Sequence, residues 1–171
     1  MRVRFVTTLP TNARRNHKGV SLIELVISVL VLGILAAVAA PVYSTSLLKY
    51  RVELAAQRIT QDVVQAQRTA RQTNSNCTIT FDLTSDSYSI SGMKSLDRAS
   101  QAYRIALNSS PYNVDIVTLA IVNQPSTALT TVAVAFNRFG MPDQGASITV
   151  RAGTLEKRID IAPISGRVSV Q

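Results

Sequence analysis

This chain of 171 residues has one histidine, one cysteine and no tryptophan. The histidine, His17, lies in a basic segment at the N-terminus, and the only thiol belongs to Cys77. One thiol allows no intrachain disulfide, and neither a second thiol nor a histidine outside that segment is present to complete a zinc site or a Cys–His pair. We therefore expect Cys77 to be a small buried apolar residue, with a disulfide to another molecule as the minor alternative.

Patterns typical of enzymes are scarce as well. The chain has seven glycines but no glycine-rich phosphate loop, and we expect Gly140 and Gly145 to lie in turns. The ten acidic residues contain no carboxylate pair that stands out from the rest. We therefore expect a protein that is not an enzyme and that holds no cofactor and no metal.

Basic residues outnumber acidic ones, but unevenly along the chain. The formal net charge is +8, and five of the eighteen basic residues precede Gly19 in a segment without acids: Arg2, Arg4, Arg14, Arg15 and Lys18. The rest of the chain carries 13 basic and 10 acidic side chains, a net charge of +3. That balance is typical of an ordinary protein surface and does not indicate a nucleic-acid-binding face.

The longest uncharged segment is strongly apolar. It runs from Leu25 to Leu48, 24 residues, and as a helix it would be about 36 Å long. The hydrocarbon core of a bilayer is about 30 Å thick, so this length predicts a single transmembrane helix, which we place at residues 20–42. Basic residues beside a membrane segment stay on the cytoplasmic side, which places the chain after Val42 in the periplasm, anchored to the inner membrane.

A short motif stands at the start of this segment. Lys18-Gly19 comes first, Val20 follows, and the carboxylate of Glu24 lies just inside the apolar run. An ionised carboxylate deep in a membrane costs about 2.5–3.5 kcal/mol, so its presence requires a reason. Together with Pro41 and the length of the run, this combination resembles the processing and methylation site of type IV pilins and type II secretion pseudopilins.

The resemblance implies how the chain is processed. A prepilin peptidase would cut between Gly19 and Val20 and methylate the new amino terminus of Val20, which makes residues 1–19 a leader peptide. Glu24 would be the fifth mature residue and would pair with the amino terminus of a neighbouring subunit during assembly. The alternative for Glu24 is a position at the membrane interface without a partner. Pro41 predicts a helix kink, and Val20 departs from the family, where phenylalanine is commoner.

A conventional secretory signal is the competing interpretation of this region. Ala37-Val38-Ala39 has the small-residue spacing of a signal-peptidase site. The apolar run is too long for such a signal, Glu24 interrupts its start, and Pro41 follows the proposed cut closely. We therefore favour the pilin-type site.

Helical periodicity continues beyond the membrane segment. Apolar residues recur at steps of three and four on one face: Val52, Ala56, Ile59, Val63, Ala66 and Ala70. The turn formers at 73–76 then end the helix. The sequence thus predicts one helix over about 21–73, of which the first half spans the membrane and the amphipathic second half packs on a sheet.

From Cys77 onward the apolar residues alternate with a period of two, which predicts β-strands. About seven strands are expected. One of them begins at residue 88, and the others lie within residues 77–83, 114–122, 131–136, 147–151, 157–162 and 167–171. We expect residues 92–112 to be irregular and the strand at 114–122 to be buried on both sides. The predicted fold class is α+β, with the strands packed behind one long helix.

The C-terminal part resembles one branch of the pilin family. Phe136 to Gly140, a hairpin, and then Gly166-Arg167-Val168 are similar to the GspH/FimT group of minor pilins and pseudopilins. That resemblance implies a type IV pilin-like fold, with the helix packed on an antiparallel β-sandwich in a periplasmic domain of residues 43–171. It also implies a structural subunit that initiates or caps a type II secretion pseudopilus or a type IV pilus. Its partners would be prepilin peptidase, other minor and major pilins or pseudopilins, and the inner membrane.

Two other functions fit parts of the sequence. Some FimT-type proteins bind DNA during natural transformation, through a C-terminal Gly-Arg-x-Arg pattern. Here Ser169 replaces the second arginine of that pattern. A basic patch on adjoining strands could still form, with Glu156 and Asp160 among its residues: Arg151, Lys157, Arg158 and Arg167. DNA binding is therefore disfavoured, and a single-pass anchored β-domain without a filament role is the remaining alternative.

Overall fold

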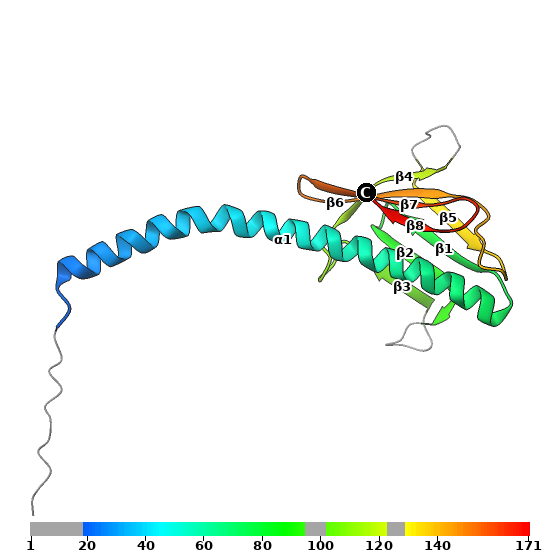
Figure 1. Ribbon diagram of the computed structural model, residues 1–171, viewed down its shortest axis with the longest axis horizontal. Helices are drawn as coiled ribbons and strands as arrows, with labels where there is room; N and C mark the ends of the chain where they lie inside the picture. The colour runs from blue at the N-terminus through cyan, green and yellow to red at the C-terminus, as the bar shows by residue number, and fades with distance from the viewer. Residues whose placement is uncertain (1–18, 95–101, 123–128) are drawn as a thin grey trace, which may run out of the picture. The chain divides into compact units, whose positions relative to one another are not determined.

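The computed structural model describes residues 19–94, 102–122 and 129–171. Its helix and strands, shown in Figure 1, are α1 (Leu22–Thr73), β1 (Cys77–Asp82), β2 (Ser87–Lys94), β3 (Ala102–Ala106), β4 (Asp115–Ile121), β5 (Thr131–Phe136), β6 (Ala146–Ala152), β7 (Leu155–Ile161) and β8 (Val168–Val170). Contacts divide the chain into two compact units, Met1–Pro41 and Val42–Gln171, and α1 contributes residues to both.

The strands form two four-stranded sheets in which every pairing is antiparallel. The first sheet has the order β3-β2-β1-β5, and the second has the order β4-β6-β7-β8. Buried side chains from both sheets and from the second half of α1 form one hydrophobic core. The predicted α+β class, with one long helix packed on antiparallel sheets, is confirmed.

The second half of α1 packs on the sheets through the face that the sequence indicates. All six residues of the predicted apolar face are at most 2% exposed, and Ala55 is buried beside them. Four of these seven side chains are alanines, so the helix backbone can approach the strands closely. The helix ends at Thr73, and Asn74 takes the left-handed conformation (φ 50°) that often closes helices.

Within the unit Val42–Gln171, α1 contacts both sheets near their edge strands. Asp62 reaches Tyr103 of β3, which is an edge strand of the first sheet. Gln67 reaches the carbonyl of Gly166, just before β8, an edge strand of the second sheet. The two sheets also contact each other at their other edges, through β5 of the first sheet and β4 of the second. The helix therefore covers the side of the core that lies between β3 and β8.

Period-two alternation determines which strand residues enter the core. In β1, Ile79 and Phe81 are fully buried, and the Phe81 ring lies 5.6 Å from that of Tyr88 on β2. In the second sheet, Ile148 of β6 pairs with Ile159 of β7, and both are buried. The inward positions expected from the sequence are confirmed for these strands.

Two expectations about the strands are wrong. Residues 92–112 are not irregular throughout, because β2 extends to Lys94 and β3 occupies Ala102–Ala106. The described residues thus contain eight strands, close to the expected number of about seven. β3 is short and lies at an edge, so Tyr103 is its one fully inward residue and the period-two signal is weak.

The strand at 114–122 is not buried on both sides. In β4, Ile116 and Leu119 are buried, whereas Asp115 and Thr118 are exposed. The register of β4 against β6 shifts between Ile116 and Thr118, so the inward residues are three apart and a period of two is lost.

Part of the predicted processing region lies outside the described residues, namely Lys18 and the rest of residues 1–18 of the leader. The helix assignment continues without a break through Pro41. The kink at Pro41 stays a prediction.

Candidate functional site

The described part of the processing motif lies at the N-terminal end of α1. Gly19 and Val20 precede the helix and are exposed. The carbonyl of Ser21 accepts the first helical hydrogen bond, from Leu25 N–H (3.1 Å), so Ser21 is the N-cap residue. The bond between Gly19 and Val20 is thus an exposed peptide bond in front of a helix start, the geometry that a peptidase needs for access.

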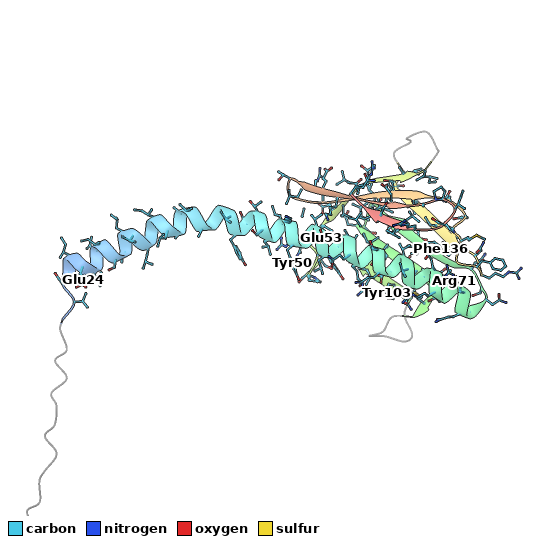
Figure 2. All side chains as sticks on the ribbon, viewed as in Figure 1. Glu24, Tyr50, Glu53, Arg71, Tyr103 and Phe136 are labelled. Atoms are coloured by element: carbon cyan, nitrogen blue, oxygen red, sulfur yellow. The ribbon has the colours of Figure 1, made fainter. Side chains whose placement is uncertain are left out.

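Glu24 lies in the first turn of α1 (Figure 2). A carboxylate in the first turn is stabilised by the partial positive charge of the helix N-terminus, by about 0.3–1 kcal/mol. Ser21 and Glu24 also have the S-x-x-E spacing of a capping box, in which the third helical residue bonds back to the N-cap N–H. This local role was not predicted from the sequence. Glu24 therefore has an explanation within one chain as well as the expected pairing between subunits.

The first half of α1 is apolar on all sides. Its large apolar side chains are exposed around the whole helix, including Leu22, Leu30 and Val38. A helix of this kind has no polar face to turn toward water, which is typical of a membrane span. By length and composition α1 can cross a membrane, with a mean hydropathy of 2.8 in its most apolar window.

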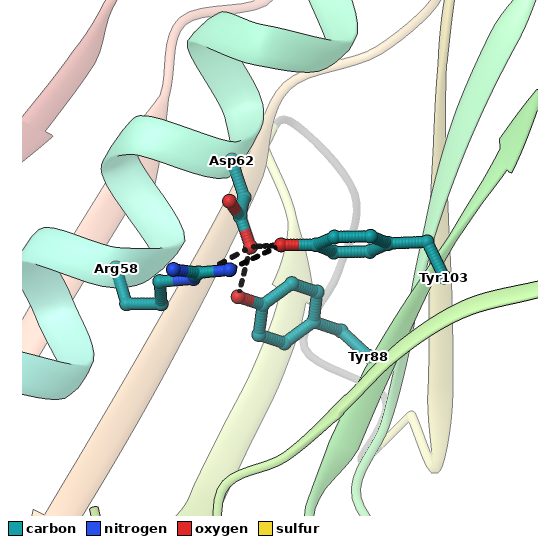
Figure 3. Close-up of polar contacts among 4 residues, drawn as sticks. All are labelled: Arg58, Asp62, Tyr88 and Tyr103. Atoms are coloured by element: carbon teal, nitrogen blue, oxygen red, sulfur yellow. Dashed lines mark hydrogen bonds and ion pairs between the residues drawn. The ribbon is translucent and has the colours of Figure 1, made fainter. Parts of the chain in front are cut away.

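A buried polar cluster joins the second half of α1 to the first sheet (Figure 3). Oδ2 of Asp62 accepts hydrogen bonds from the hydroxyls of Tyr88 (2.5 Å) and Tyr103 (2.7 Å) and from Nε of Arg58 (3.2 Å). Arg58 also donates to the Tyr103 hydroxyl (2.6 Å). Asp62 is 6% exposed, so its charge is removed from water and is balanced by these donors.

The cluster changes the acidity of its members. Burial, and then the nearby Asp62 carboxylate, raise the pKa of Tyr88 above its ordinary value. Burial and the hydrogen bond to Asp62 raise the pKa of Tyr103 to about 12. Burial alone would lower the pKa of Arg58, but the Tyr103 hydrogen bond and the Asp62 charge outweigh it and raise that pKa. At neutral pH the cluster therefore holds neutral tyrosines and a charged arginine.

The loops that carried the resemblance to GspH/FimT proteins contact the end of α1. Nε of Arg71 donates to the Phe139 carbonyl (3.0 Å), and a Cβ at Gly140 would collide with the Arg71 guanidinium. The Gln67 amide donates to the Gly166 carbonyl (2.7 Å), and a Cβ at Gly166 would collide with that amide. Gly140 and Gly166 both have positive φ, so each combines a turn with a close approach of the helix.

The basic residues considered for DNA binding have acidic neighbours. Arg151 lies 3.7 Å from Glu156, and Arg158 lies 3.1 Å from Asp160. Lys157 is hydrogen-bonded to Glu53 on α1. Three of the four basic residues of the expected patch are thus in ion pairs, which reduces the positive potential available to a phosphate backbone.

Cys77 is buried, as expected, and its Sγ donates to the Ser91 carbonyl (3.0 Å). Burial raises the pKa of this thiol, which disfavours the reactive thiolate. In the ranges that the structure describes, no group of three or more His, Cys, Asp and Glu side chains is arranged to hold a metal ion.

Asp62 is the main residue that the sequence analysis missed. It adjoins Val63 of the apolar face, and Arg58 precedes it by four residues, the spacing of an ion pair on one helix face. An acid beside an apolar stripe with a basic partner one turn away is a signal that can be found in the sequence. Its tyrosine partners are 26 and 41 residues away, and only the fold identifies them.

Known proteins match this chain in its N-terminal segment and, separately, in its overall fold. The family described as the prokaryotic N-terminal methylation motif matches residues 14–40, which confirms the resemblance in that segment. The type IV minor pilin FimU of Pseudomonas aeruginosa (strain PAO1) is 10% identical, with a TM-score of 0.49, over 72% of this chain and 90% of that one. The minor pseudopilin EpsH from the Type 2 Secretion System of Vibrio cholerae is 10% identical, with a TM-score of 0.47, over 71% of this chain and 96% of that one. No curated protein sequence matches the chain.

Proposed function

We propose that the chain is a minor pilin or pseudopilin, a structural subunit that initiates or caps a type IV pilus or a type II secretion pseudopilus. It is made with a leader of residues 1–19, cut between Gly19 and Val20 by a prepilin peptidase, and methylated at the amino group of Val20. Residues 20–42 hold it in the inner membrane with residues 43–171 in the periplasm, until it joins a filament of other pilins or pseudopilins.

The methylation motif at residues 14–40 is the observation that carries this proposal. It lies at the start of a helix whose first half is apolar on all sides, and the second half of the same helix is part of a folded domain. A subunit with an apolar segment attached to a domain can exist in two states. In the first the segment lies in the membrane, and in the second it packs against the same segments of other subunits in a filament. Both states remove the apolar side chains from water.

Glu24 has a defined task in the second state. A carboxylate among packed apolar helices is costly unless a positive group lies beside it. Cutting after Gly19 creates such a group, the methylated amino terminus of Val20, and a neighbouring subunit can present it to Glu24. The same reaction that releases the leader therefore makes the subunit competent to assemble.

The mature N-terminus tests the processing. The full chain is expressed with a prepilin peptidase, and the N-terminal peptide is identified by mass spectrometry. We expect N-methylated Val20, and we expect the leader to remain in Gly19→Val. A mature protein that begins at Ala40 would instead indicate a signal-peptidase cut after Ala39, and would overturn the proposal.

Two variants test the role of Glu24. Glu24→Ala removes the charge together with the side chain that has the capping-box spacing, whereas Glu24→Gln keeps a side chain that suits a capping box and removes only the charge. We expect both variants to be processed and neither to be incorporated into filaments, while Ser28→Ala, one turn later, is incorporated normally. Incorporation of Glu24→Gln would show that the local cap is sufficient, and incorporation of Glu24→Ala would exclude an assembly role.

A further inference from the structure

Residues 137–142, the Phe139 loop, follow β5 and expose apolar side chains that the core of the domain does not use. The loop closes on Asn137, whose carbonyl accepts a hydrogen bond from Gly140 N–H (2.7 Å). Oδ1 of the same asparagine accepts from the N–H groups of Phe139 (2.9 Å) and Met141 (3.1 Å). Gly140 is buried, whereas Phe139 and Met141 are 60% and 45% exposed. The backbone of the loop is thus fixed while its two largest apolar side chains lie in water.

A second turn lies beside the Phe139 loop. A Cβ at Gly166 would be 3.2 Å from Cδ of Pro142, so the turn at 163–166 is in contact with the loop. This turn carries Ile164, which is 80% exposed. Single apolar side chains are ordinary on a protein surface, but here three of them lie on two adjoining segments. Aromatic residues, methionine and arginine are enriched in the cores of protein interfaces, and a preformed loop binds without the entropic cost of being ordered.

Three arginines lie near these apolar side chains. Nε of Arg71, in the last turn of α1 (Figure 2), donates to the Phe139 carbonyl (3.0 Å). The guanidinium of Arg138 lies 5.1 Å from the centre of the Phe139 ring. Arg68 precedes Arg71 by three residues and therefore lies on the same helix face. All three arginines are exposed, and none of them pairs with a carboxylate among the described residues, so carboxylates from outside the chain would remove their mutual repulsion.

Two cavities on the described surface of the same domain do not complement this basic, apolar surface. The cleft of about 310 Å³ between α1 and β7 is lined by Lys49 and Lys157. The cavity of about 520 Å³ on the outer face of the first sheet is lined by Asp82 but also by Arg104. Arginines docking in either cavity would meet positive charge, which favours a partner other than a second copy of this chain.

A nucleic acid fits the surface less well than a protein does. Asp143 is exposed and directly follows the Phe139 loop, so a carboxylate would lie near a phosphate backbone. Met141 and Ile164 offer no planar ring on which a base can stack, and only Phe139 does. Aliphatic side chains beside arginines instead match a protein surface that has both apolar and acidic groups.

We infer that the Phe139 loop docks on a different subunit of the same filament, in an apolar recess that carries carboxylates at its rim. Phe139 enters the recess, with Met141 and Ile164 at its edge. The guanidiniums of Arg71 and Arg138 pair with the carboxylates. Such a partner removes the apolar side chains from water and supplies the missing negative charges. The inference rests on the filament role in the proposed function, and it adds the face that is used and the chemistry of the neighbour.

Photocrosslinking of the full chain in its native host tests this docking, with p-benzoylphenylalanine in place of Phe139. The crosslinked peptide is identified by mass spectrometry after digestion. We expect it to come from another subunit that has its own N-terminal methylation motif, and to contain Asp or Glu.

Charge reversal tests the carboxylates. Arg138→Glu places a carboxylate opposite carboxylates and should lower the crosslinking yield about tenfold. Arg151→Glu, the same change at an exposed position near the other end of β6, should leave the yield unchanged. Replacing the contacting carboxylate of the partner by lysine should restore the crosslink of Arg138→Glu. Near-ultraviolet circular dichroism of purified Arg138→Glu should match that of the unmodified chain, which separates a lost contact from a lost fold.

The mature N-terminus, measured on the same samples, separates this inference from the proposed function. A chain that keeps its leader would refute the proposed function and the docking together. A chain with N-methylated Val20 that gives no crosslink from position 139 would refute the docking alone. A crosslink only to a second copy, to nucleic acid or to lipid, or equal yields in Arg138→Glu and Arg151→Glu, would also overturn the inference.

Discussion

The junction between α1 and the first sheet can be tested by removing the Asp62 carboxylate. In Asp62→Ala the hydroxyls of Tyr88 and Tyr103 and the guanidinium of Arg58 lose a common acceptor. Breaking a buried charged pair costs about 3–5 kcal/mol. The Arg58 side chain is 35% exposed and can regain some hydration, so we expect the free energy of unfolding to fall by about 3 kcal/mol, at the lower end of that range.

Asp62→Asn separates the charge from the hydrogen bonds. The amide oxygen can still accept from the tyrosine hydroxyls, but it offers Arg58 no negative charge. We expect a loss of about 1–2 kcal/mol, because a hydrogen bond to a charged group contributes about 1.5–3 kcal/mol and a neutral one about 0.5–1.5 kcal/mol. Asp115→Asn, at an exposed position on β4, is the matched control and should change stability by less than about 0.5 kcal/mol.

The assay exploits the absence of tryptophan. The near-ultraviolet circular dichroism of this chain comes mainly from five tyrosines and four phenylalanines, and Tyr88 and Tyr103 are buried in the cluster. Urea titrations of the full chain in detergent micelles, followed by this signal, give the free energy of unfolding of the domain. If Asp62→Ala is as stable as Asp115→Asn, the cluster does not stabilise the packing of the helix on the sheet.

Two further predictions concern pH and a close contact. The pKa of Tyr103 is raised from 10.0 to about 12 in the folded chain, so its contribution to stability is complete below pH 10 and is lost as the pH rises toward 12. In Tyr103→Phe the free energy of unfolding, measured by urea titration, should therefore depend less on pH between 10 and about 12. Gly166→Ala adds a Cβ that collides with the Gln67 amide and forces alanine to φ 63°, whereas Gly92→Ala at φ 79° meets nothing within 4 Å. The positive φ should lower the free energy of unfolding of both variants by about 1–2 kcal/mol, measured by urea titration. The collision with Gln67 should lower it further in Gly166→Ala, and equal losses in the two variants would exclude a role for this contact.

The periodicity of the apolar residues predicted most of the fold because most of the helix and strand segments bury only one face. The six apolar residues of α1 from Val52 to Ala70 face one core, and their steps of three and four identify the helix and its buried face. The same logic fails in β4, where a register shift between Ile116 and Thr118 changes the spacing of the inward residues. It fails again in β3, which is too short to show alternation. Both failures are local departures from regular geometry.

The residues of the candidate site also differ in how far the sequence predicts them. The Lys18–Glu24 motif is a contiguous pattern, and the family match over residues 14–40 agrees with it. The hydrogen bond between Glu53 of α1 and Lys157 of β7, in contrast, spans 104 residues. The bonds from Tyr88 and Tyr103 to Asp62 span 26 and 41 residues. Pairings of that kind depend on which strand lies beside the helix, and no local pattern in the sequence specifies it.

The small side chains of α1 explain why polar contacts recur along its buried face. Alanine contributes little to hydrophobic burial, at about 0.8 kcal/mol per buried carbon, so a face rich in alanines brings the backbones close without fixing how far the helix slides. Sliding by one turn of four residues would place Ala66 where Ala70 had been, but it would also place Ala55 where the buried Ile59 had been. The hydrogen bonds of Asp62 with Tyr88, of Gln67 with Gly166 and of Arg71 with Phe139 would all be lost by such a slide. The polar groups therefore act together with Ile59 in determining the register of the helix against the sheets, and the alanines provide the close approach.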